Sequence, residues 1–182
     1  MKALIPWADG VEEMEAVILT DVLRRAGWTV VTAGLKPGPV SAARGVRLIP
    51  DRLWTEEQPA DFDALVLPGG ALGTRNLAAH EGVRAAVRAF DVAGKMLAAV
   101  CAAPLVWQAA GILRAGQRLT SHPAVRDQLR DVEWVDERVV EDGHRITSQG
   151  PGTCFEFALA LVARAEGPRR AAALAAEMRL AY

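Results

Sequence analysis

Short apolar runs alternate along the chain with longer stretches in which apolar residues recur every three or four positions. The short runs predict buried strands at 2–6, 28–33, 64–67 and 96–100, with a weaker candidate at 47–49. The longer stretches predict helices at 12–26, 81–92, 102–110, 153–165 and 168–180. A hairpin is expected around Asp142-Gly143. This alternation predicts an α/β fold, a three-layer sandwich in which helices cover both faces of a mostly parallel sheet.

Parallel sheets of this kind place their ligand sites at the carboxyl ends of the strands. Two such ends stand out, at Leu67-Pro68-Gly69-Gly70 and at Val100-Cys101-Ala102. We therefore expect a functional site to be built where these two segments meet.

Cys101 directly follows one predicted strand and precedes a predicted helix, with alanines on both sides. A residue at such a junction sits on a sharp turn with its side chain exposed. Unpaired N–H groups at the start of the helix would lower the pKa of the thiol below its usual value of about 8.5 and make it reactive. The alternative is a small hydrophobic residue of the core.

Gly69 and Gly70 are candidate backbone donors, because glycine lets an N–H group approach a ligand closely. A dinucleotide-binding fingerprint is excluded by Pro68, which stands where that motif needs glycine. The N–H groups of Gly70 and Ala102 could instead stabilise an oxyanion formed at Cys101. A plain turn is the alternative.

Glu15 lies on the same helical face as Ile18, Leu19 and Val22, which form an inward-facing stripe. A carboxyl group there must be paired or protonated, and a raised pKa would let it donate a proton. The alternative is a glutamate at the edge of the stripe that reaches solvent. Its neighbours in the first turn, Glu12 and Glu13, are interpreted as surface charges that favour the helix dipole.

Of the three histidines, His122 follows Leu119 at a predicted strand end, on the side of the sheet where it could assist Cys101. His80 and His144 are expected on the surface. No set of His, Cys or acidic residues has metal-ligand spacing, so neither a metal nor another cofactor is predicted.

The bulk composition limits the partners and the location. The chain has 182 residues, 51% of them hydrophobic, which favours a single domain over residues 1–182. With 21 basic and 22 acidic residues and no basic stretch, nucleic acid is not an expected partner. The N-terminus becomes polar at Asp9, too early for a signal peptide, and Pro104 interrupts the apolar segment 96–113, so no membrane is expected. Two cysteines then predict free thiols in the cytoplasm.

Six segments in order along the chain resemble the ThiJ/PfpI superfamily, in the branch of the parkinsonism-associated deglycase and the YajL proteins. The matching segments are 9–15, 24–27, 67–73, 98–104, 121–123 and 147–153. The resemblance implies a flavodoxin-like sandwich, usually a homodimer. It also implies Cys101 as the nucleophile, Glu15 as its protonated partner, Gly70 and Ala102 as oxyanion donors, and His122 nearby.

Three departures from related families bear on the function. Ala102 replaces the histidine of the peptidase branch, and no His-x-Glu follows as in related amidotransferases. Close relatives often carry arginine at Gln149, which with an arginine matching Arg44 forms an anion-binding patch near the dimer interface. The resemblance therefore leaves that patch open for this chain.

The resemblance implies a glyoxalase or deglycase that acts on α-oxoaldehydes such as methylglyoxal, or on glycated proteins, and protects against oxidative stress. Cys101 would attack the aldehyde, and Glu15 would shuttle a proton. The alternative is a redox sensor or chaperone in which Cys101 oxidises to the sulfinate. An intracellular cysteine peptidase ranks last because of Ala102.

Overall fold

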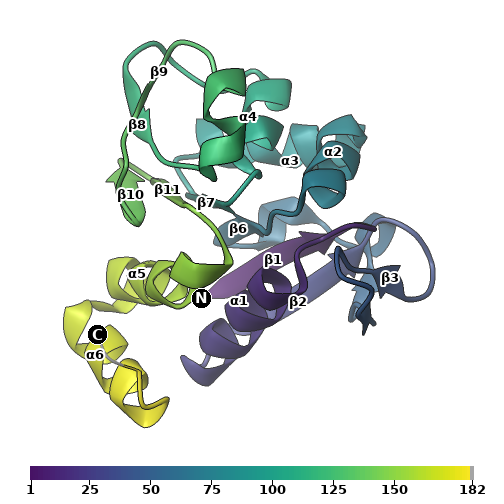
Figure 1. Ribbon diagram of the computed structural model, residues 1–182. Helices are drawn as coiled ribbons and strands as arrows, with labels where there is room; N and C mark the ends of the chain where they lie inside the picture. Colours follow the sequence, from purple (N-terminus) through teal and green to yellow (C-terminus); the bar gives the residue numbers. More distant parts are fainter. Residues whose placement is uncertain (181–182) are drawn as a thin grey trace.

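The computed structural model describes residues 1–180 (Figure 1) and contains a central sheet of seven strands. The strands lie in the order β10-β11-β7-β6-β1-β2-β5. All neighbours pair in parallel except β10 and β11, which form the antiparallel hairpin expected around Asp142-Gly143. The strands of this sheet are β1 (Lys2–Trp7), β2 (Thr29–Gly34), β5 (Arg52–Leu53), β6 (Ala64–Leu67), β7 (Met96–Val100), β10 (Val139–Asp142) and β11 (Arg145–Ser148).

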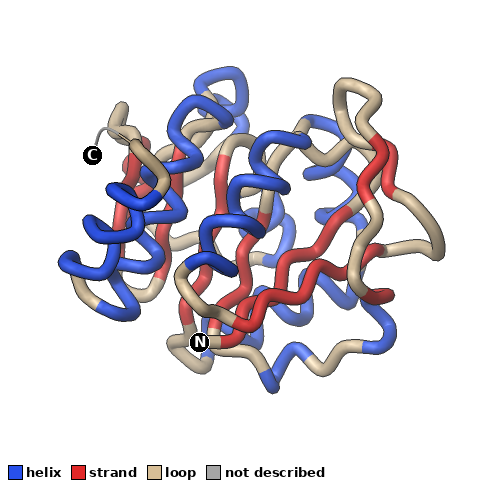
Figure 2. Tube along the Cα trace, turned by 90° about the horizontal axis from the view of Figure 1, so that it is seen from below, coloured by secondary structure: helices blue, strands red, loops and turns tan. Residues whose placement is uncertain are grey.

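Helices cover both faces of the sheet, as Figure 2 shows, and make it a flavodoxin-like sandwich, in agreement with the prediction. One layer contains α1 (Glu13–Arg25), α5 (Cys154–Glu166) and α6 (Pro168–Glu177). The other contains α2 (Ala71–Ala79), α3 (Glu81–Val92) and α4 (Pro104–Ala110).

The core is divided by the sheet because successive side chains of a strand point to opposite faces. In β1, Ala3 and Ile5 pack under α1 and α5, whereas Leu4 packs under α3. Strands buried on both faces read as continuous apolar runs, which is why these segments could be recognised from the sequence.

Two small sheets and several short 3₁₀ turns complete the fold. β3 (Val40–Ser41) and β4 (Arg47–Leu48) pair antiparallel, and β8 (Gln117–Leu119) and β9 (Val132–Trp134) pair in parallel. The 3₁₀ turns are Trp54–Glu56, Pro59–Asp61, Pro123–Gln128 and Pro151–Thr153.

The carboxyl ends of β11, β7, β6 and β1, four neighbouring strands, meet at one edge of the sheet. The segment after β7 carries Cys101, and the segment after β6 carries Gly69 and Gly70. The fold thus brings together the two junctions singled out from the sequence.

Candidate functional site

Cys101 occupies a sharp turn between β7 and α4, and its backbone has a φ of +63°. That conformation is uncommon for a residue with a side chain, and it is characteristic of functional turns. Two hydrogen bonds hold the turn: the Cys101 N–H donates to the Ser148 carbonyl (2.9 Å), and the His122 N–H donates to the Cys101 carbonyl (2.8 Å). The cysteine is partly exposed and makes no disulfide.

The carboxyl group of Glu15 faces this thiol from the first turn of α1. Glu15 is fully buried, which agrees with its place on the apolar stripe and excludes the solvent-reaching alternative. Its Oε2 accepts a hydrogen bond from the Gly69 N–H at 2.7 Å, and the carboxyl group interacts with the Cys101 thiol. Its Oε1 is buried and forms no regular hydrogen bond within the described part of the chain.

The Pro68-Gly69-Gly70 turn fits closely between α1 and Cys101. A Cβ on Gly69 would lie 2.6 Å from the Cys101 Cβ and 2.9 Å from Glu15 Oε2. A Cβ on Gly70, whose φ is +89°, would lie 2.2 Å from the Gly10 carbonyl oxygen. A larger residue at either position would therefore force the neighbouring atoms to move.

The backbone N–H groups of Gly70 and Ala102 interact with the Cys101 sulfur and lower its pKa. The sequence predicted these two groups as donors to an oxyanion formed at Cys101. Gly69 was predicted as a further donor to a ligand, and this is corrected by the structure. Its N–H is already bonded to Glu15, so Gly69 orients the carboxyl group instead.

The carboxyl and the thiol have strongly shifted pKa values. Burial raises the pKa of Glu15 to about 7, although the hydrogen bond from Gly69 opposes the shift. Burial and the charge of Glu15 raise the pKa of Cys101 to about 12, although the N–H groups of Gly70 and Ala102 oppose it. Because the two groups interact directly, these values belong to the pair. Between pH 7 and 12 the pair of Glu15 and Cys101 therefore holds a single proton.

The predicted lowering of the Cys101 pKa is therefore wrong. The main reason is that the thiol is largely buried, and the second is the adjacent carboxylate of Glu15. In addition, α4 begins only at Pro104, two residues later than predicted, so Cys101 lies outside its first turn. While the pair holds one proton, the sulfur is ionised only in those molecules in which Glu15 carries that proton.

His122 lies beside the nucleophile through its backbone, but its side chain is exposed. Its Nδ1 accepts a hydrogen bond from the Ala124 N–H (3.2 Å) and caps the 3₁₀ turn that follows. This bond places the proton of the neutral ring on Nε2. The main chain of His122 therefore lies next to Cys101, as expected. Its imidazole ring caps the 3₁₀ turn.

Glu12 is a site residue that sequence reasoning missed. Its carboxylate caps α1 by accepting the Glu15 N–H at 2.8 Å, and its own N–H donates to the Gly69 carbonyl at 3.1 Å. The signal in the sequence is the three-residue spacing of Glu12 and Glu15, the spacing of a capping contact. It was missed because Ser, Thr, Asp and Asn are the usual caps. Glu13, also expected on the surface, is buried and accepts the Arg44 N–H.

The two members of the expected anion patch have separate contacts. Gln149 Nε2 donates to Asp136 Oδ1 at 2.7 Å. The exposed Arg44 lies instead in a pocket of about 440 Å³ together with Arg75 from α2.

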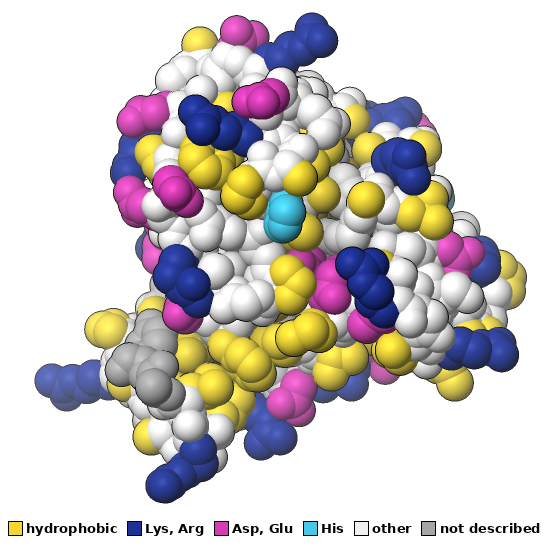
Figure 3. Space-filling view, in the orientation of Figure 1, with side chains coloured by type: hydrophobic (Ala, Val, Ile, Leu, Met, Phe, Trp, Pro, Cys, Tyr) yellow, Lys and Arg dark blue, Asp and Glu magenta, His cyan; other side chains and the backbone are white. Residues whose placement is uncertain are grey.

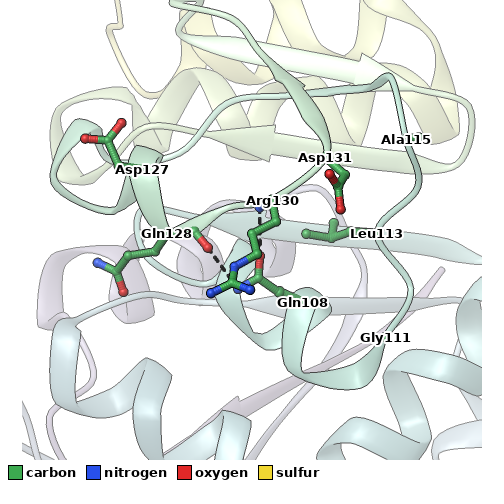
Figure 4. Close-up of a pocket in the computed structure, with 8 residues that line it drawn as sticks. All are labelled: Gln108, Gly111, Leu113, Ala115, Asp127, Gln128, Arg130 and Asp131. Atoms are coloured by element: carbon green, nitrogen blue, oxygen red, sulfur yellow. Dashed lines mark hydrogen bonds between the residues drawn. The ribbon is translucent and has the colours of Figure 1, made fainter.

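A surface pocket of about 790 Å³ lies away from Cys101, between α4 and the segment after β8 (Figure 4). Gln108 spans it: its Nε2 donates to the Gln128 carbonyl and its Oε1 accepts the Arg130 N–H, both at 2.9 Å. These polar groups satisfy one another, and the pocket contains none of the reactive side chains.

Among the side chains that the structure describes, no three from His, Cys, Asp or Glu gather closely enough to hold a metal ion. Over the same residues, every helix is too short or too polar to cross a lipid bilayer.

Comparison with known proteins gives a consistent result. Protein dj-1beta of Drosophila melanogaster is 40% identical over 183 residues, covering 99% of this chain and 97% of the relative. The crystal structure of Drosophila DJ-1beta matches with a TM-score of 0.94 at 39% identity, covering 100% of this chain and 98% of that one. The structure of oxidized Toxoplasma gondii DJ-1 matches with the same TM-score at 33% identity and covers 100% and 99%.

A relative whose name states an activity is the glutathione-independent glyoxalase DJR-1.2 of Caenorhabditis elegans. It is 37% identical over 169 residues, which cover 92% of this chain and 89% of the relative. The model of the DJ-1/PfpI family matches residues 1–164. With its fold, its strained cysteine and its buried carboxyl group, this chain belongs to the DJ-1/PfpI family.

Proposed function

We propose that this protein is a cysteine-dependent glyoxalase or deglycase that acts on α-oxoaldehydes such as methylglyoxal, or on their protein adducts. The observation that carries the proposal is the arrangement around Cys101, where one sulfur meets a carboxyl group of raised pKa and two backbone donors. The C. elegans relative named as a glyoxalase supports it.

The reaction begins when the Cys101 thiolate attacks the aldehyde carbon and forms a C–S bond. The aldehyde oxygen becomes an oxyanion, which the N–H groups of Gly70 and Ala102 can stabilise. Glu15 holds the proton while the sulfur is ionised, and it donates this proton to the oxyanion to give a hemithioacetal.

Glu15, now ionised, removes the hydrogen of the former aldehyde carbon as a proton and returns it to the neighbouring carbonyl carbon, while the hydroxyl proton of the first carbon passes to the oxygen of the second. The first carbon is thereby oxidised to a thioester and the second is reduced to an alcohol. Water then hydrolyses the thioester, which gives a hydroxy acid and frees the thiol. This internal redox step needs no external oxidant or cofactor.

The test is to supply methylglyoxal and to measure lactate. We expect lactate from the wild type and a loss of at least about a hundredfold for Cys101→Ser, because the hydroxyl is a far weaker nucleophile. Cys154→Ser is the matched control, since that thiol is fully buried and should leave turnover intact. Equal turnover by wild type and Cys101→Ser would contradict the proposal.

A second candidate function is a redox sensor, which the solved oxidized form of the Toxoplasma relative favours. Peroxide would oxidise Cys101 through the sulfenate to the sulfinate, with the N–H groups of Gly70 and Ala102 beside the new oxygens. Mass spectrometry should find two added oxygens on Cys101 and none on the buried Cys154. Equal oxidation of both cysteines would rule out a specific sensor.

We also propose that the protein is a cytoplasmic homodimer. Both of its cysteines are free thiols, the state that a reducing compartment maintains. Hydrophobic side chains gather over α1 and α5 in Figure 3, and Met14, Val17 and Phe155 are the large exposed ones there. An exposed apolar patch of this kind marks a protein interface.

A further inference from the structure

Three hydrogen bonds close a ring beneath the reactive cysteine. The Glu15 N–H donates to Glu12 Oε2 (2.8 Å), and the Glu12 N–H donates to the Gly69 carbonyl (3.1 Å). The Gly69 N–H donates to Glu15 Oε2 (2.7 Å) and completes the ring. The ring joins the start of α1 to the turn after β6, so it fixes where the Glu15 carboxyl group lies.

We propose that Glu12 is a positioning residue for Cys101: through this ring it aims the Glu15 carboxyl group at the sulfur, and it holds a negative charge beside that group. The proposal rests on the role of Cys101 as nucleophile in the proposed function. Glu12 is hydrogen-bonded to Glu15 and Gly69, and it would act on the sulfur through them.

The ring explains why a glutamate stands at the cap of α1. Aspartate, serine or threonine is the more usual cap, and each satisfies the free N–H groups of a first turn. Glu12 does this with a carboxylate that is only half-buried and is three residues from a fully buried one. Two carboxyl groups so close disfavour a second negative charge, so the charge of Glu12 favours a proton on the buried Glu15.

The groups that face Glu15 come from four elements. Burial raises its pKa, the Gly69 N–H lowers it, the charge of Glu12 raises it and the Cys101 thiol lowers it. From α5, the Cys154 thiol lies 3.9 Å from the Glu15 carbonyl oxygen and is itself kept neutral by burial. Burial and Glu15 raise the pKa of Cys101, and the backbone N–H groups of Gly70 and Ala102 lower it. Glu12 therefore acts on the sulfur through Glu15.

This arrangement predicts how the sulfur responds when the charge is removed. Between pH 7 and 12 the pair of Glu15 and Cys101 holds one proton. The rate of alkylation in that range measures the fraction of molecules in which Glu15 has the proton and the sulfur is ionised. In Glu12→Gln the carboxyl group of Glu15 loses the neighbouring charge that favours its protonated form, so the fraction of molecules with an ionised sulfur falls.

The experiment measures the alkylation rate of Cys101 by iodoacetamide from pH 5 to 10, with the site identified by mass spectrometry. In the wild type this rate should rise with pH and level off above pH 7, at a plateau. For Glu12→Gln we expect the plateau rate to fall by about threefold, the effect of lowering the pKa of Glu15 by about half a unit. Glu12→Asp keeps both the charge and a favoured cap residue, so its plateau should stay near that of the wild type.

Glu13→Gln is the matched control, because it removes the same charge one residue along from a side chain that bonds Arg44 instead. Its plateau should remain within about twofold of the wild type. A wild-type plateau in Glu12→Gln, or an equal fall in Glu12→Asp, would overturn the proposal. A cap that only stabilises the helix would lower the melting temperature and leave the plateau unchanged, which also overturns it.

Failure of this inference and failure of the proposed function are distinguishable. If the wild type forms no lactate but Glu12→Gln still lowers the alkylation plateau, the enzyme proposal fails and the role of Glu12 stands. If lactate forms and the plateau does not change, the reverse holds.

Discussion

The buried carboxyl group of Glu15 couples the stability of this protein to pH. Burial raises its pKa from the ordinary 4.5 to about 7 in the folded chain. The folded state therefore retains a proton that the unfolded state releases above pH 4.5. The stabilisation is fully present below pH 4.5 and is lost as the pH rises through 7.

We expect the free energy of unfolding to contain a loss of about 3 kcal/mol from this group between pH 4.5 and 7. In Glu15→Gln this loss disappears, because the amide does not ionise. Urea unfolding of both proteins at pH 4.5 and pH 8 measures the difference. Equal pH dependence in the two proteins would contradict the raised pKa.

A second prediction concerns Gly69, where a side chain would meet Cys101 and Glu15. In Gly69→Ala the new methyl group would lie 2.6 Å from the Cys101 Cβ, so the turn must move. We expect a loss of about 1–3 kcal/mol in unfolding free energy and a strong fall in Cys101 alkylation. Gly152→Ala is the control, since nothing lies within 4 Å of its Cβ and neither quantity should change.

Among the elements, α3 and β11 are joined by a buried ion pair at the end of the sheet opposite the site. Arg145 Nε donates to Asp91 Oδ1 at 2.8 Å, and both residues are at most 9% exposed. Although burial opposes ionisation, hydrogen bonds from Arg145 and His144 hold the pKa of Asp91 below its ordinary value.

Removing one partner of this pair leaves the other charge buried alone. We expect Asp91→Asn to lose about 3–5 kcal/mol of unfolding free energy, measured with urea. Alkylation of Cys101 in the folded variant should not change. Glu81→Gln, which breaks only exposed ion pairs on the same helix, should unfold at the wild-type urea concentration. If Asp91→Asn changed the unfolding free energy as little as Glu81→Gln does, the prediction that the buried pair is needed for stability would be wrong.

How well each element could be predicted depends on where its stabilisation comes from. The strands β6 and β7 and the helix α3 have the predicted bounds, because their own apolar patterns specify them. α2 was not predicted, because Gly73 and the preceding glycines resemble a loop. It forms through tertiary contact: a Cβ on Gly73 would lie 2.7 Å from the Val11 nitrogen, so glycine lets the helix pack on that backbone.

The same distinction applies to the site. The place of Cys101 and the burial of Glu15 follow from a strand end and from an apolar stripe, which are local patterns. The pKa of Cys101 and the hydrogen bond of Gly69 depend on which atoms of distant segments meet. No pattern in the sequence specifies those contacts, and there the predictions were wrong.

At the scale of the whole molecule, the apolar patch over α1 and α5 should join two copies of the chain. Val17, which is 48% exposed, lies one turn from both Glu13 and Asp21. Val17→Lys therefore suits the helix but places a charge in the proposed interface, where it should shift a dimer to monomers.

Sedimentation velocity of the wild type and the variant measures this. Val92→Lys is the matched control, because Val92 is 89% exposed on α3 in the other helical layer, and it should sediment as the wild type does. A wild type that sediments as a monomer would contradict the dimer.

The reactive pair unites position 15 with position 101, and neither segment can set the ionisation of the sulfur without the other. A nascent, truncated or partly unfolded copy therefore has a cysteine with the ordinary pKa, and only a copy with its sheet assembled has the raised one. The pH dependence of Cys101 alkylation thus distinguishes correctly assembled molecules from the rest of a preparation, without a substrate.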